Sequence, residues 1–173
     1  MTLGTTAAPV LESTVGKPMQ AAVYRVYGSP DVLKLETVQK PTPQDNQVLI
    51  QVVAASTAAG DWHLLRAEPF LMRFIYGLFK PKYPILGAAL AGRVEAVGRN
   101  VTQFQPGDEV FGDLSTTGFG AFAEYVAAPE HAFALKPTNL TFEQAATVPV
   151  SAVTALQGLR DHGKIQPGQK VLI

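Results

Sequence analysis

AGRVEAVGRNVTQFQPGDEVFG, residues 91–112, decides the fold class of this chain. Its first part, residues 91–98, has the short apolar pattern of a β-strand. Pro106-Gly107-Asp108 then supplies a turn into a second strand at residues 109–111. Strands this short, separated by glycine and proline, predict a mainly β domain folded as a partly open barrel.

Further strands are predicted on both sides of this stretch. Residues 47–55 form a continuous apolar run, which suits a strand buried on both faces. Residues 21–27, 32–38 and 121–127 also carry strand patterns, and residues 56–66 form a small-residue turn leading into a short helix. The helices are therefore predicted to be additions to a β domain.

The most apolar segment has the periodicity of a helix and can be interpreted in three ways. It could pack in the core, cover an apolar substrate pocket as a lid, or lie at a membrane surface. Core packing is the first interpretation. Membrane binding is the least favoured, because only Arg73, Lys80 and Lys82 supply charge nearby. The apolar residues of this stripe are Phe70, Leu71, Phe74, Ile75, Leu78 and Phe79.

The character of the chain changes after Pro137. Residues 141–144, Thr-Phe-Glu-Gln, match a capping box, and a helical stretch over residues 150–159 follows. Residues 170–173, Lys-Val-Leu-Ile, then begin a new apolar strand. A strand needs a partner, so this one could pair between two copies as an exposed edge and form a homodimer.

Composition excludes several classes of function. The chain of 173 residues is long enough for one ordinary domain, and its 14 basic residues balance its 14 acidic ones, so nucleic acid and anionic lipid are not expected partners. There is no cysteine, hence no disulfide and no thiolate metal site. No apolar run reaches the roughly 20 residues of a spanning helix, so no membrane is expected. Residues 1–18 lack a basic region and are interpreted as a mobile tail of a cytoplasmic protein.

Several motifs, taken together, carry a resemblance to a known family. The chain resembles the medium-chain dehydrogenase/reductase superfamily, and most closely its zinc-free quinone-oxidoreductase-like branch. The resemblance covers roughly residues 19–173. It implies a GroES-like, partly open β-barrel with helical additions, NADP or NAD as cofactor, and a small apolar substrate such as a quinone or an enone. The motifs are residues 27–33, YGSPDVL; 46–50, NQVLI; 86–98, from Leu86 to Gly98; 105–112, QPGDEVFG; 120–125, GAFAEY; and 155–159, ALQGL.

The resemblance also suggests a division of the chain. Residues 1–18 would be the tail, residues 19–140 the GroES-like substrate domain, and residues 141–173 the linking helices with the first strand of an absent Rossmann domain. The main cofactor site would lie in that absent domain. Residues 118–123 fit the letters G-x-G-x-x-A, but they lead into a strand pattern and not a helix, so no dinucleotide site is expected there.

Zinc is not expected. The positions that match the metal ligands of zinc-dependent relatives are Ala58, Ala88 and Ala89, and alanine has no lone pair to donate. His131 and His162 stand in separate segments and are interpreted as surface or packing residues.

The catalytic candidates lie in the turn that begins at residue 57. The resemblance aligns residues 57–61, Thr-Ala-Ala-Gly-Asp, with the Val-Asn-Pro-x-Asp stretch of the zinc-free branch. The aspartate of that stretch is present as Asp61, but its asparagine is replaced by alanine at position 58. Asp61 could orient the first turn of a helix, which is the favoured role, or join a polar network at the cofactor. His63 could supply a proton after hydride transfer, or could be a helix-surface residue.

Other site residues follow from the same resemblance. Ser56, Ala58 and Thr154 are the expected cofactor contacts, although Thr154 could simply bond its own helix backbone. Trp62, Phe74 and Phe119 are the expected lining of the substrate pocket.

Two functions of different classes remain open. The chain could be the substrate-side half of a reductase, inactive alone, in which the cofactor carries the chemistry. It could also be a stand-alone GroES-like binding or scaffold module, which the alanines at 58 and 89 would suit.

Overall fold

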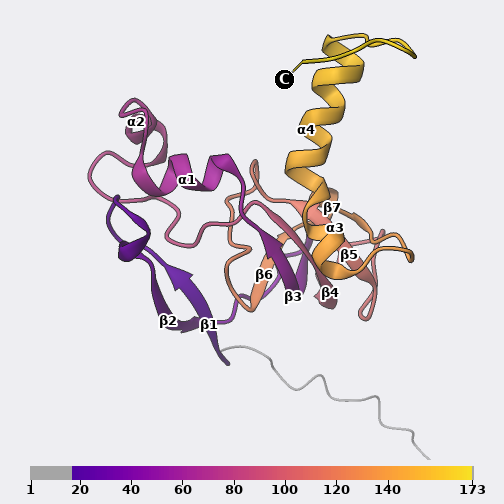
Figure 1. The fold of residues 1–173 in the computed structure, drawn as a ribbon. Helices are drawn as coiled ribbons and strands as arrows, with labels where there is room; N and C mark the ends of the chain where they lie inside the picture. Colours follow the sequence, from indigo (N-terminus) through magenta and orange to yellow (C-terminus); the bar gives the residue numbers. More distant parts are fainter. Residues whose placement is uncertain (1–16, 173) are drawn as a thin grey trace, which may run out of the picture.

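Two antiparallel sheets form the framework of residues 17–172, the part of the chain that the computed structural model describes (Figure 1). Strands β1 (Pro18–Val23) and β2 (Lys34–Gln39) form a two-stranded sheet. A five-stranded sheet has the order β6-β3-β4-β5-β7, with β6 and β7 as its edges, so the partly open β domain predicted from the sequence is confirmed. Its strands are β3 (Gln47–Ser56), β4 (Ala89–Val97), β5 (Glu109–Asp113), β6 (Tyr125–Pro129) and β7 (Phe133–Leu135).

Strand β3 lies at the centre of the core. Val48, Leu49 and Ile50 are at most 1 % exposed, as expected of a strand covered on both faces. Its register against β4 shifts after Leu49 and again after Val52, and such irregularities bend a strand and increase its twist. The main core also includes Leu90, Val94, Phe104, Val110, Leu114, Ala121, Val126, Ala128 and Phe133.

The buried side chain of Lys40 joins the two sheets. Lys40 follows β2 directly, and its ammonium forms an ion pair with Glu95 of β4. The same ammonium lies 3.6 Å from the ring centre of Tyr125 of β6. A buried cation requires such partners, so Lys40 fixes the end of the small sheet to the large one.

The helices fall into two groups along the chain. Helices α1 (Ala59–Arg66) and α2 (Met72–Tyr76) lie between β3 and β4 in sequence. Helix α3 (Phe142–Ala146) packs on β3 and β4, and is followed by η3 (Val148–Ala152), α4 (Val153–Leu156) and η4 (Gln157–His162). Figure 1 shows the part around α4 extending away from the sheets. Two short 3-10 turns, η1 (Pro30–Val32) and η2 (Glu130–Ala132), complete the elements.

The capping box at the start of α3 is confirmed. The amide of Gln144 donates to Thr141 Oγ1 over 3.2 Å, and the amide of Thr141 donates to Gln144 Oε1 over 3.0 Å. Both orphan donors of the helix start are satisfied by local side chains, which is why the sequence alone could locate this helix.

The apolar stripe of residues 70–79 differs from its first interpretation. Only Met72–Tyr76 is helical, and Gly77, with φ of +117°, ends the helix. Phe74 and Ile75 are each 70 % exposed and Phe79 is 90 % exposed, so the prediction that this stripe packs in the core is wrong. Five helical residues provide too little length for a buried stripe, and only one narrow face turns inward.

Strand boundaries also differ from the predictions in places. Residues 170–172 form no strand, because no neighbouring strand is available to pair with them among the described residues. Residues 101–104 are irregular, and the strand predicted from residue 121 begins at Tyr125. The short edge strand β7 was not predicted. The tail predicted for residues 1–18 falls, except for Lys17 and Pro18, outside the described residues.

A glycine at position 92 is required by the close approach of β3 and β4. A Cβ atom there would lie 2.2 Å from the carbonyl oxygen of Gln51 and 2.7 Å from a methyl group of Ile50. The backbone of β3 cannot retreat without breaking its pairing with β6, so any side chain at position 92 strains the core.

We therefore expect Gly92→Ala to lower the free energy of unfolding by about 1–3 kcal/mol, the usual cost of overpacking. Urea denaturation followed by circular dichroism measures the change. Gly158→Ala is the matched control, because a Cβ atom at Gly158 meets nothing within 4 Å. Equal stability of the two variants would contradict this account of the β3–β4 contact.

Candidate functional site

An apolar cavity of about 190 Å³ lies beneath helices α1 and α2. Its wall combines the start of α1, the inner face of α2, the entry into β4 and the loop after β5, so it gathers segments that are distant in the sequence. The lining residues are Ala58, Gly60, Asp61, Leu64, Met72, Tyr76, Ala88, Ser115, Phe119 and Val150.

A second cavity, of about 250 Å³, adjoins the other side of Asp61. Asp61 lines both cavities and is their one charged lining residue. The second cavity is lined by Pro30, Leu33, Thr57, Asp61, Trp62, Leu65, Leu86 and Phe122.

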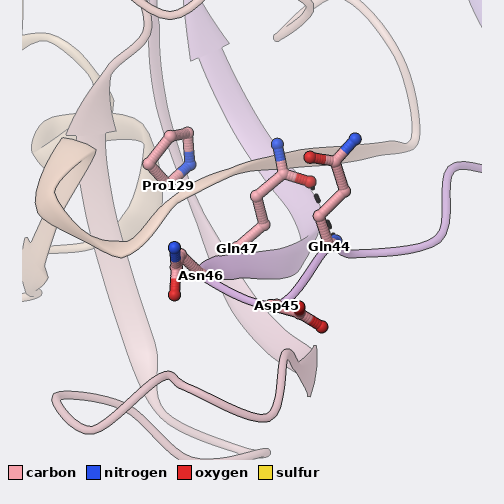
Figure 2. A pocket seen from close by; sticks show the side chains of 5 residues that line it. All are labelled: Gln44, Asp45, Asn46, Gln47 and Pro129. Carbon is pink, nitrogen blue, oxygen red and sulfur yellow. Dashed lines mark hydrogen bonds between the residues drawn. The ribbon is translucent and has the colours of Figure 1, made fainter.

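A larger hollow on the surface has a different character. It measures about 580 Å³ and is lined by residues 44–47 and Pro129 (Figure 2). Gln44, Asp45, Asn46 and Gln47 form a polar turn there, with the amide of Gln44 bonded to Gln47 Oε1 over 3.0 Å. None of the residues expected at the site lies in this hollow, and four of its five lining residues are polar, so the cavities beside Asp61 are the better candidates for an apolar ligand.

The carboxylate of Asp61 is buried and accepts two backbone hydrogen bonds. Oδ2 accepts the amide of Ala58 over 2.9 Å, and Oδ1 accepts the amide of Gly87 over 3.0 Å. Asp61 is 4 % exposed, and this burial raises the pKa of its carboxyl, while the backbone hydrogen bonds act in the opposite direction. Both oxygens are thus engaged in holding the backbone in place.

The local sequence explains this arrangement. Asp61 is the third residue of α1, where its side chain reaches back to the amide of Ala58 at the N-cap position. Gly87 approaches it from the loop before β4 with φ of +95°, and a Cβ atom at Gly87 would lie 2.7 Å from a ring carbon of Phe122. Glycine therefore allows the loop to reach the carboxylate.

His63 lies at the outer side of α1. Its Nδ1 is 2.8 Å from the carbonyl oxygen of Glu68, an acceptor, so this nitrogen carries the proton. The imidazole also packs edge-on against Trp62, with ring centres 4.8 Å apart. His63 lines neither cavity and is tied to the turn that follows α1.

The expected cofactor contacts lie in three different settings. Ala58 lines the first cavity. Ser56 Oγ donates to the carbonyl oxygen of Ala146 over 2.8 Å, which fastens α3 to the end of β3. Thr154 lies exposed on α4. Of these three residues, Ala58 alone lines a cavity beside Asp61.

The three expected pocket residues are also separated. Phe119 lines the first cavity and packs against Tyr76 and Tyr83, with ring centres 6.3 and 5.5 Å away. Trp62 lines the second cavity. Phe74 lies exposed on the outer face of α2, away from both linings.

Sequence reasoning missed the residues that α2 contributes. Met72 and Tyr76 are four apart, so they share one helical face, and this face lines the cavity. The spacing of Met72 and Tyr76 is visible in the sequence, but the prediction for this segment was based on the more apolar stripe beside them. Ser115 and Val150 carry no local signal, because loops far apart in sequence bring them to the wall.

The three alanines that the sequence resemblance matches to zinc ligands lie close to the site. Ala58 and Ala88 line the first cavity, and Ala89 is the buried first residue of β4. Within residues 17–172, no three His, Cys, Asp or Glu side chains are grouped so that they could hold a metal ion. Over the same residues, no helix has the length and apolar character to cross a membrane.

The open sheet with helices over an apolar cavity defines the class: a GroES-like β domain with helical additions. Residues 44–138 match the family model described as the alcohol dehydrogenase GroES-like domain. The chain belongs to this family, and with it to the medium-chain dehydrogenase/reductase superfamily.

Relatives of known name agree with this assignment. The 2-methylene-furan-3-one reductase of Solanum lycopersicum is 38 % identical over 171 residues, covering 92 % of this chain and 41 % of the relative. The quinone oxidoreductase of Homo sapiens is 34 % identical over 163 residues, covering 93 % of this chain and 46 % of the relative. The structure of the quinone oxidoreductase from Coxiella burnetii superposes with a TM-score of 0.78 at 32 % identity. The match covers 88 % of this chain and 47 % of that protein. The chain spans less than half the length of these relatives.

Replacing Asp61 tests its place in the site. In Asp61→Asn the amide nitrogen faces a backbone N–H and leaves a buried donor without an acceptor, so the free energy of unfolding at pH 7 should fall by about 1–3 kcal/mol. The pKa of Asp61 is higher in the folded than in the unfolded chain, so the folded chain binds this proton more tightly. The resulting stabilisation of the wild type is complete below the ordinary aspartate pKa and disappears as the pH rises through the pKa of the folded chain. The deficit of the variant should therefore be largest in acid.

Asp108→Asn is the control, since Asp108 accepts one backbone hydrogen bond, from Gln105, at a partly exposed turn. Urea denaturation over a pH series measures the loss of unfolding free energy in Asp61→Asn and in Asp108→Asn. A deficit for Asp61→Asn no larger than that of the control would refute the positioning role.

Proposed function

We propose that this chain is the substrate-side domain of an NAD(P)H-dependent, zinc-free oxidoreductase that reduces a quinone or an activated C=C or C=O bond. The observation that carries the proposal is the apolar cavity beneath α1 and α2, which has room for a small ring compound and no grouped metal ligands in its lining. The names of the relatives, two quinone oxidoreductases and a furanone reductase, support this substrate class.

The nicotinamide cofactor would supply the hydride, and the chain's own residues would bind and orient the substrate. The small side chains of Ala58 and Ala88 leave space in the cavity wall for a flat ring. Tyr76 and Ser115 are the lining residues with hydroxyl groups, and a hydroxyl can donate a hydrogen bond to a substrate carbonyl.

The cavity of about 190 Å³ fits such a substrate and not a whole dinucleotide. We propose that most of the cofactor binds to a second domain of the whole protein, following the division into residues 19–140 and 141–173. The exposed hydroxyl of Thr154 on α4 is the group of this chain that could reach it.

Within this proposal Asp61 is a positioning residue. Its two hydrogen bonds fix Ala58 and Gly87, and both segments adjoin the cavity wall. His63 is held by Glu68 at the far end of α1, and we propose that it braces this turn rather than donating a proton to substrate.

A stand-alone binding module is the second candidate. The specific observation in its favour is that alanines occupy positions 58 and 89 beside the cavity, where the family resemblance expects polar groups. Titration of NADPH followed by nicotinamide fluorescence separates the candidates when performed on the whole protein. Saturable micromolar binding supports the reductase, and a flat response supports the binding module.

The substrate site is tested by filling the cavity. Gly60 lines it, and a Cβ atom at Gly60 meets nothing within 4 Å, so Gly60→Leu adds a bulky side chain at the cavity wall from a position where the backbone leaves room for a Cβ atom. We expect affinity for menadione to fall by about tenfold or more, equivalent to about 1.4 kcal/mol. Quenching of Trp62, the single tryptophan, reports binding.

Gly158→Leu is the control, because Gly158 is equally open but lies on η4, outside the cavity lining. Both substitutions should maintain or raise stability, since leucine favours helix over glycine by about 1 kcal/mol. Unchanged menadione affinity in Gly60→Leu would count against this cavity as the substrate site.

A further inference from the structure

We propose that the outer surface of α2 docks on an anionic lipid bilayer. This surface consists of the apolar side chains of Phe70, Leu71, Phe74, Ile75 and Phe79, bordered by basic residues. These five side chains are between 58 % and 90 % exposed. So many exposed aromatic and aliphatic groups in one short segment indicate an interaction site.

The two faces of α2 serve different purposes. Met72 and Tyr76 turn inward and line the cavity, and Tyr76 also packs on Phe119. Phe74 and Ile75 lie between them in sequence and point outward, each 70 % exposed. The inward face accounts for how α2 is held on the protein, so packing within residues 17–172 does not explain the apolar outer face.

The charge around this surface favours an anionic partner. Residues 66–83 hold four basic residues and one acidic residue, Glu68, a net charge of +3 in a chain whose total is 0. Lys80 and Lys82 are exposed, and within residues 17–172 neither they nor Arg73 form an ion pair. Apolar side chains bordered by lysine and arginine are the usual chemistry of interfacial binding to anionic lipid.

The same charge argues against a second copy of the chain as the partner. A twofold contact through this surface would bring the basic residues of both copies together, and like charges in contact disfavour association. The sequence-based expectation that no membrane is bound rested on the lack of a spanning apolar run, the balanced charge of the chain and the few basic residues near the stripe. It did not take into account that the stripe is exposed in the structure.

Such docking would also bear on substrate supply. Apolar quinones and enones concentrate in bilayers, and the helix that would touch lipid with Phe74 lines the cavity with Tyr76. This link rests on the proposed function, whereas the lipid contact itself does not.

Vesicle flotation tests the proposal. The chain should float with vesicles of phosphatidylcholine and phosphatidylglycerol, should bind pure phosphatidylcholine about tenfold more weakly, and should be released by salt. Phe74→Asp with Ile75→Asp, and separately Lys80→Glu with Lys82→Glu, should each reduce binding about tenfold or more. Leu35→Asp is the matched apolar control, because Leu35 is 75 % exposed on β2, and Lys34→Glu is the charge control.

A second readout locates the contact. In a Trp62→Phe background, Phe74→Trp places the single tryptophan on the outer surface of α2, and its emission should shift to the blue and be quenched by brominated lipid. Equal binding to neutral and anionic vesicles, no quenching, or concentration-dependent dimers without flotation would each overturn the proposal. Menadione binding by the Phe74→Asp and Ile75→Asp variant, measured without vesicles, should be unchanged, so failure of lipid docking is distinguishable from failure of the substrate site.

Discussion

Two backbone hydrogen bonds to the buried carboxylate of Asp61 hold the candidate site together. One bond fixes the start of α1 at Ala58, and the other fixes Gly87, which leads into β4. Both cavities share Asp61 as part of their wall. A carboxylate has two separate acceptor oxygens, one for each of these amides, whereas an amide side chain of the same size has one acceptor oxygen and places a donor in the other position. The shape of the site thus depends on a group that need never touch a substrate.

The alanines beside Asp61 give the site its chemical character. Ala58 and Ala88 contribute small apolar surface to the wall. Selectivity in such a cavity comes from shape and aromatic contact, supplied here by Tyr76 and Phe119, with few polar groups to orient a ligand. Sites of this kind discriminate weakly between molecules of similar size and polarity.

The sequence predicted those features that local chemistry determines. The apolar run of β3 and the capping box at Thr141 depend on neighbouring residues alone, and both appear where expected. The hydrogen bond from Gly87 to Asp61 spans 26 residues, and no local sequence pattern predicts it. The direction of each face of α2 was equally hidden, because apolar residues occupy both faces and tertiary contact decides which one turns inward. Residues 170–172 show the same limit, since a strand forms only where a partner is present.

The helix that extends from η3 through η4 has a consequence for motion. Residues 151–162 are exposed, apart from the half-buried Leu159, so this helix gains little from packing. Helices of this length are marginal in water without tertiary contacts. Its amide hydrogens should therefore exchange through frequent local opening, while those of β3 and β4 exchange only when the whole sheet unfolds. In the described residues we therefore expect a cooperative β unit and a helical segment whose opening is independent of it.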